Sequence, residues 1–143
     1  MNLKKNDTLT ANKRIALRGI LIALALILSY AEAQIPAFFA VPGMKLGLTN
    51  LVVLLALYRM GSGSAVTINM IRIVLVALLF GNGMSLAYSA AGGLLSGFVM
   101  ILLKKTGRFS VVTVSIVGGV MHNVGQILVA MVLLGTSSLA WYL

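Results

Sequence analysis

Residues 85–108 read SLAYSAAGGLLSGFVMILLKKTGR, and this pattern sets the expectation for the rest of the chain. The first part, 85–103, carries no charged side chain, and the run ends at Lys104, Lys105 and Arg108. About 20 mostly apolar residues in helical conformation cross the hydrocarbon core of a bilayer. The stretch therefore predicts a membrane-spanning helix followed by a basic loop.

Four further apolar runs flank this one, at about 15–34, 46–60, 64–81 and 109–134. Residues with charged or helix-breaking side chains separate them. The composition agrees, since 60% of the residues are hydrophobic, 9% are charged and the mean hydropathy is +1.07. Soluble domains carry about 25% charged residues. We expect an all-α integral membrane bundle of five to six transmembrane helices.

The two ends of the chain need separate interpretation. Residues 1–14 are polar and basic, and we expect a cytoplasmic tail there, followed by a single transmembrane domain over 15–143. A cleaved secretory signal is the alternative, but the first apolar run is longer than signal peptides carry. After 134 the chain re-enters apolar sequence at LAWYL (139–143). Either it ends at an interface on Trp141 and Tyr142, or a sixth span is truncated or absent, which we favour.

The basic residues predict the orientation of the helices. With a cytoplasmic N-terminus and alternating spans, nine basic residues fall inside: Lys4, Lys5, Lys13, Arg14, Arg18, Arg59, Lys104, Lys105 and Arg108. Lys45 alone falls outside, and Arg72 lies within a span. Cytoplasmic loops carry an excess of Lys and Arg. We therefore expect a multi-pass protein of the cell membrane with its N-terminus in the cytoplasm.

Several classes of function find no support in the residues. The pI near 10.6 could indicate nucleic-acid binding, but the basic residues sit at the ends of apolar runs and form no polar face. There is no cysteine, one histidine and only two acids, so neither a metal site nor a catalytic triad can be assembled by the usual residues. No phosphate-binding loop motif is present. We expect a protein that is not an enzyme and needs no cofactor.

Polar residues at membrane depth form the candidate binding site. Such residues are costly in a bilayer and usually face a bundle interior or a cavity. Counted at 1.5 Å per helical residue, most fall in the outer half of their spans, while the inner halves are aliphatic. The spacing predicts an outward-facing pocket for a small molecule, with these candidate contacts: Glu32, Lys45, Asn50, Arg72, Tyr88, His122, Asn123 and Gln126.

Each candidate also has a purely structural interpretation. His122 could bond a neighbouring helix, and Arg72 could pair with Glu32 or with backbone carbonyls across their difference in depth. The segment QIPAFFAVPGMK (34–45) contains both prolines and could be a lid over the pocket or a plain connector. The glycines of GGLLSG (92–97) indicate close helix packing rather than phosphate binding.

Four stretches resemble the membrane-protein family of heptaprenyl diphosphate synthase component I, also called Gx transporter. They are VPGMKLGLTNLVVLLAL (41–57), RIVLVALLFG (72–81), YSAAGGLLS (88–96) and HNVGQILVA (122–130). That family is grouped with the substrate-binding S components of energy-coupling factor (ECF) transporters. The resemblance implies a six-helix bundle that captures a vitamin-like molecule outside. Its implied partners are a coupling membrane subunit and ATPases.

S components often dock through small residues of the first span, and the resemblance implies two candidate sets here. One is Gly19 with Ala23, and the other is Ala25, Ser29 and Ala33. The leading interpretation is therefore an S-component-like subunit of an ECF-type importer for a vitamin-like or isoprenoid-related molecule. The alternative is a non-catalytic membrane accessory subunit of a polyprenyl diphosphate synthase in quinone biosynthesis. The two acids of the chain cannot build the Asp-rich magnesium site of the synthase itself.

Overall fold

The computed structural model describes residues 3–34, 47–81 and 83–135, with the side chains of 3–10 and 134 left out. The regular secondary structure of this part of the chain is all α-helix. The helices are α1 (Leu3–Gln34), α2 (Leu48–Met60), α3 (Ser62–Leu79), α4 (Gly83–Thr106) and α5 (Val111–Leu134). The expectation of an all-α membrane bundle is confirmed.

Four of the helices are long and apolar enough to cross a membrane: Ala11–Gln34 within α1, and most or all of α3, α4 and α5. The exception is α2, which has only 13 residues. Left-handed Gly47 precedes it and Gly61 follows it, both with positive φ. A residue with a Cβ rarely adopts this backbone conformation, so glycine fixes both ends of α2.

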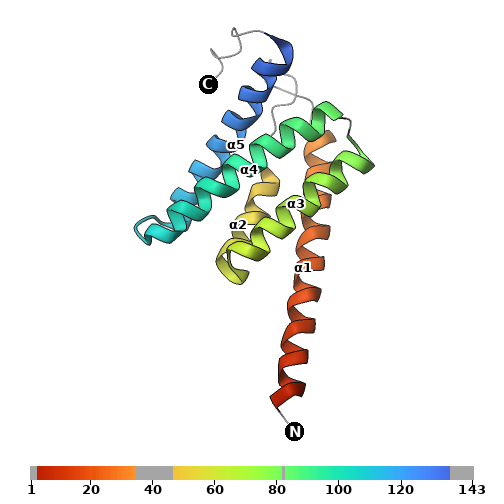
Figure 1. The fold of residues 1–143 in the computed structure, drawn as a ribbon, viewed down its shortest axis with the longest axis vertical. Coiled ribbons are helices and arrows are strands. Elements are labelled where there is room, and N and C mark those ends of the chain that lie inside the picture. The colour runs from red at the N-terminus through yellow and green to blue at the C-terminus, as the bar shows by residue number, and fades with distance from the viewer. Residues whose placement is uncertain (1–2, 35–46, 82, 136–143) are drawn as a thin grey trace.

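The shortest helix lies at the centre of the bundle. Helix α2 contacts each of the other four helices, and α4 packs between α3 and α5. Within the described residues, α1 makes no contact with α4 or α5, so α1 and α5 lie at opposite edges (Figure 1). Figure 1 also shows the N-terminal part of α1 extending beyond the rest of the bundle.

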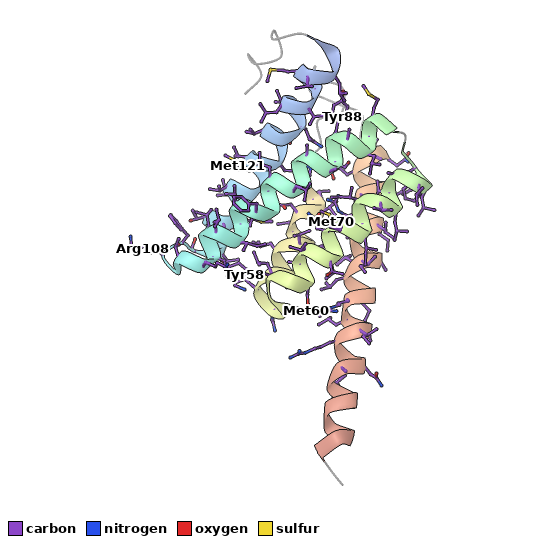
Figure 2. The ribbon with its side chains drawn as sticks, in the orientation of Figure 1. Tyr58, Met60, Met70, Tyr88, Arg108 and Met121 are labelled. Atoms are coloured by element: carbon purple, nitrogen blue, oxygen red, sulfur yellow. The ribbon has the colours of Figure 1, made fainter. Side chains whose placement is uncertain are left out.

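The connections divide the bundle into two ends. The N-terminal end of α1, the α2–α3 junction and the α4–α5 turn point the same way, and the α3–α4 junction points the other way (Figure 1). Figure 2 shows Arg108 at the α4–α5 turn and Tyr88 near the far end of α4. We call the end that contains the α4–α5 turn the basic end, because basic residues gather there. Those that the structure describes are Lys13, Arg14, Arg18, Arg59, Lys104, Lys105 and Arg108.

Two of these basic residues also tie helices together. Arg18 of α1 donates from Nε and Nη2 to Ser64 Oγ at the start of α3, at 3.2 and 3.0 Å. Lys104 of α4 donates to the carbonyl oxygen of Leu57 near the end of α2, and its ammonium lies 5.0 Å from the centre of the Tyr58 ring. A cation at a helix C-terminus satisfies carbonyls that have no partner within the helix.

The apolar core occupies the half of the bundle nearest the basic end. Its largest contribution comes from α2, and its buried members are Leu21, Ala25, Val52, Val53, Leu54, Ala56, Leu57, Ala65, Ile68, Met100 and Val114. The side chains that face outward are also apolar, including Ile20 and Ile27 of α1 and Ile116 of α5. A helix that is apolar on all sides suits burial in lipid.

Helices α4 and α5 form the most extensive helix pair, and glycines permit it. A Cβ added to Gly92 would lie 2.7 Å from the carbonyl oxygen of His122, and one added to Gly125 would lie 2.8 Å from that of Ala91. Both distances are shorter than real Cβ contacts, and the atoms they meet belong to the backbone. Small residues let membrane helices approach this closely.

Candidate functional site

Buried polar side chains from all five helices gather between the middle of the bundle and the end away from the basic end. We call this set the polar layer. All its members are buried: Ser29, Glu32, Thr49, Asn50, Asn69, Arg72, Ser89, Ser96, His122 and Gln126. The asymmetry expected from the sequence is therefore present, with an apolar core at one end and polar groups toward the other.

Direct hydrogen bonds join part of the polar layer across helices. Ser29 Oγ of α1 and Thr49 Oγ1 of α2 lie 3.0 Å apart. Ser96 Oγ of α4 donates to Asn50 Oδ1 of α2 over 3.0 Å. Between helices in lipid, bonds of this kind hold the packing together. They fix the N-terminal end of α2 against both α1 and α4.

Asn69 of α3 connects two neighbours at once. Its Nδ2 donates to the carbonyl oxygen of Gly93 on α4 over 3.0 Å, and its Oδ1 accepts from Arg72 Nη2 over 2.8 Å. Gly93 has no side chain, so Asn69 can reach the backbone of α4; a Cβ there would lie 3.1 Å from Asn69 Nδ2. Asn69 thereby anchors the guanidinium of Arg72 in the interior.

Glu32 and Arg72 interact electrostatically, but each has a different hydrogen-bond partner. The Glu32 carboxylate accepts from the backbone N–H of Gly47, at the start of α2. Arg72 donates to Asn69, and the charge of Glu32 acts on it through space. The carboxylate instead satisfies an N–H at a helix N-terminus, where negative charge is favoured.

Some buried polar atoms find no hydrogen-bond partner within the described part of the chain. They are both amide atoms of Gln126, Asn123 Oδ1 and Arg72 Nε. Gln126 is only 4% exposed and Arg72 6%. Leaving a buried polar group unpaired costs about 1–3 kcal/mol, more for a charged one. Such groups in a native structure call for an explanation, and water, an ion or a ligand can provide it.

The remaining candidates lie in varied positions. His122 is buried on α5 and approaches α4 at Gly92, as does Gln126 four residues later. Tyr88 and Asn123 are half-buried. Lys45, and the proposed lid over 34–45 from residue 35 on, lie outside the described residues. The structure thus places Glu32, Asn50, Arg72, His122 and Gln126 inside the bundle.

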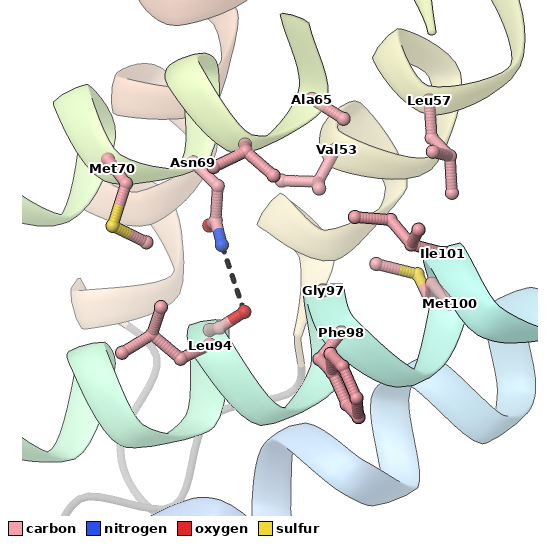
Figure 3. A pocket seen from close by; sticks show the side chains of 12 residues that line it. Val53, Leu57, Ala65, Asn69, Met70, Leu94, Gly97, Phe98, Met100 and Ile101 are labelled. Atoms are coloured by element: carbon pink, nitrogen blue, oxygen red, sulfur yellow. Dashed lines mark hydrogen bonds between the residues drawn. The ribbon is translucent and has the colours of Figure 1, made fainter. Parts of the chain in front are cut away.

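A separate groove lies between α2, α3 and α4, nearer the basic end. Its volume is about 210 Å³, and Asn69 is its one polar side chain (Figure 3). It is lined by Val53, Leu57, Ala65, Val66, Asn69, Met70, Gly93, Leu94, Gly97, Phe98, Met100 and Ile101. The groove opens sideways, because Val66, Leu94 and Phe98 are exposed at its rim. The sequence pattern did not predict this groove.

The small residues of α1 divide between two surfaces. Ala25 and Ser29 are buried inside the bundle, and Gly19, Ala23 and Ala33 are exposed. Of the two candidate docking sets, Gly19 with Ala23 is the one that lies wholly on the surface. A Cβ added to Gly19 would meet nothing within 4 Å.

Five members of the polar layer were not among the predicted ligand contacts: Ser29, which was expected to dock a partner, and Thr49, Asn69, Ser89 and Ser96. Thr49 directly precedes Asn50. Ser96 lies in an apolar run, between Gly93 and Gly97. A hydroxyl in a membrane span often bonds to its own helix. Nothing in the local sequence therefore distinguishes Ser96, which pairs with a residue 46 positions away.

Fold and site together define a helical membrane bundle with a polar interior toward one end. The family model described as heptaprenyl diphosphate synthase component I matches residues 21–143. The chain belongs to this family. No curated protein matches the chain, and no solved structure does either.

Proposed function

We propose that the chain is a membrane-embedded substrate-binding subunit, similar to the S component of an ECF-type importer. One observation carries this proposal: the polar layer includes buried groups, above all the Gln126 amide, that have no partner among the described residues. An amide offers both a donor and an acceptor. A small molecule with complementary groups would satisfy it.

The chemistry of the layer supports recognition rather than catalysis. Arg72 Nε is a cationic donor held in place through Asn69, and Gln126 lies beside His122 on the α5 face that meets α4. Anchored donors of this kind fix the orientation of a ligand. We infer that the chain is not an enzyme. We also infer that the basic end lies in the cytoplasm and that the ligand enters from the opposite side.

Loss of a retained ligand tests the site. Native mass spectrometry of the full chain purified from its own membranes should show a bound small molecule. We expect Gln126→Ala to lower its occupancy about tenfold, or ~1.4 kcal/mol of affinity. Ser115→Ala, on the same helix nearer the basic end, should retain it. Equal occupancy in wild type and Gln126→Ala would exclude the polar layer as the site.

Co-purification tests the assembly. The tagged chain, extracted from native membranes in mild detergent, should bring down a coupling membrane subunit and two ATPases. In the proposed complex the exposed Gly19–Ala23 surface of α1 contacts the coupling subunit. Gly19→Leu, which meets no neighbouring atom within the chain, should reduce recovery of the complex without unfolding the bundle.

The family description favours a second candidate, a non-catalytic membrane subunit of a polyprenyl diphosphate synthase. In that role the chain would hold the synthase at the bilayer where its apolar product accumulates. The same purification separates the two candidates. Recovery of a soluble, Asp-rich synthase without ATPases would favour the second.

A further inference from the structure

The groove between α3 and α4 opens into the hydrocarbon region rather than into water. Its residues on α3 and α2 lie within about three turns of the basic end, counted at 1.5 Å per residue. Its rim residues Val66, Leu94 and Phe98 are exposed on the outside of the bundle. What borders this opening in a membrane is lipid.

The size and lining of the groove suit a hydrocarbon chain. A dry apolar cavity of about 150 Å³ binds benzene, so about 210 Å³ accommodates a segment of one chain. Both polar atoms of the Asn69 amide already have a partner, since Nδ2 bonds Gly93 and Oδ1 bonds Arg72. Two methionines, Met70 and Met100, line the walls, and their flexible side chains adapt to irregular shapes.

The groove leads to positive charge at one end. On α4, Gly97 and Ile101 line it, and Lys105 follows at the same four-residue spacing, so the three share a helix face. Lys105 is exposed. Neighbouring Lys104 is tied to the Leu57 carbonyl and leaves Lys105 as the outward-facing ammonium. The other end of the groove, at Leu94 and Met70, is uncharged (Figure 3).

We propose that this groove binds one acyl chain of an anionic phospholipid from the leaflet at the basic end, with the headgroup on Lys105. Apolar walls accept the chain, and the lysine at its end selects a negative headgroup. The groove shares only Asn69 with the polar layer and is lined by none of the residues with unpartnered polar atoms, so it does not depend on the proposed transport function. It would couple the packing of α3 against α4 to the lipid composition of that leaflet.

Photolabelling in a defined bilayer tests the proposal. The full chain is placed in phosphatidylcholine nanodiscs that contain a small fraction of phosphatidylglycerol with a diazirine in its acyl chain, and adducts are mapped by tandem mass spectrometry. We expect adducts concentrated on the groove residues of α3 and α4. Uniform labelling of exposed residues on all helices would overturn the proposal.

Two variants fill the groove from opposite walls. Gly97→Leu projects into it, since a Cβ there meets only Asn69 Nδ2, at 3.8 Å, and Val66→Phe enlarges the facing rim. Either should lower groove labelling about fivefold, or ~1 kcal/mol. Gly119→Leu is the matched control, because Gly119 is on α5, has open space around it and does not line the groove. Unchanged labelling in both groove variants would refute the site.

The headgroup is tested separately. Lys105→Gln should lower labelling by the phosphatidylglycerol probe about fivefold, the attraction that one basic residue exerts near an anionic surface. Lys13→Gln, on the protruding part of α1, should leave it unchanged. Equal labelling by phosphatidylcholine and phosphatidylglycerol probes would overturn the anionic selection. Competition by farnesyl diphosphate but not by unlabelled phosphatidylglycerol would assign the groove to an isoprenoid instead.

Discussion

Asn69 is the polar residue whose loss should matter most for stability. Replacing it with leucine keeps the branched shape but leaves the Gly93 carbonyl without its side-chain donor and Arg72 Nη2 without its acceptor. We expect Asn69→Leu to destabilise the bundle by about 1–3 kcal/mol, measured by reversible unfolding in mixed detergent micelles.

Thr67→Val is the control for this measurement, because Thr67 is exposed and bonds only to the carbonyl of Gly63 in its own helix. It should change stability by no more than about 0.5 kcal/mol. If Asn69→Leu unfolded at the same midpoint as the wild-type protein, Asn69 would not hold Arg72 in place.

At the residue level, the sequence predicted which side chains are buried better than it predicted their partners. Depth counting placed Asn50, His122 and Gln126 toward the outer side, and all three are buried. It left open whether Glu32 pairs with Arg72. That outcome depends on Gly47, whose backbone N–H binds the carboxylate just before α2 begins. Partners separated by 46 residues, as for Asn50 and Ser96, require the fold itself.

The contact between α4 and α5 depends on single glycines. A side chain at Gly125 would meet backbone atoms of Ala91 and Gly92 at 2.8–2.9 Å, which cannot move aside independently. Gly125→Leu should therefore cost about 1–3 kcal/mol through overpacking. Gly119→Leu, six residues earlier with nothing within 4 Å of its Cβ, should cost little.

The same micelle unfolding measures both glycine variants, with helicity by circular dichroism as a check on each helix. If Gly125→Leu and Gly119→Leu unfold at the same midpoint, α4 and α5 are not as close as described. A loss confined to Gly125→Leu would confirm that backbone proximity, rather than helix propensity, sets the stability of this pair.

At the level of elements, hydropathy predicted the ends of α2 to α5 closely, because charged residues and glycines mark where each span stops. It missed the start of α1, which begins at Leu3 and not near residue 15, because a polar, basic segment can continue a helix beyond its apolar part. The run at 109–134 corresponds to α5 (Val111–Leu134), which Ser110 caps by accepting from the Thr113 N–H over 3.1 Å. The central position of α2 could not be predicted. Its apolar sequence resembles that of the other spans, and only the helix contacts reveal that it touches all four.

The orientation of the whole molecule can be tested because the chain contains no cysteine. Gly63→Cys lies near the basic end and Gly83→Cys near the opposite end, and neither new Cβ meets an atom within 4 Å. A membrane-impermeant thiol reagent added to intact cells should label Gly83→Cys. It should label Gly63→Cys only after the membrane is opened. The reverse pattern would place the basic end outside, against the positive-inside rule.

The brevity of α2 has a consequence for hydration. Its 13 residues span about 20 Å, against a hydrocarbon thickness of about 30 Å. Asn50, at its third position, bonds Ser96 midway along α4, so α2 begins well beneath the far tip of that helix. Non-helical backbone is tolerated at such depth only if protein encloses it or water reaches it. For the proposed binding function, a ligand would therefore reach the Asn50 side chain only after passing below the level of the far end of α4.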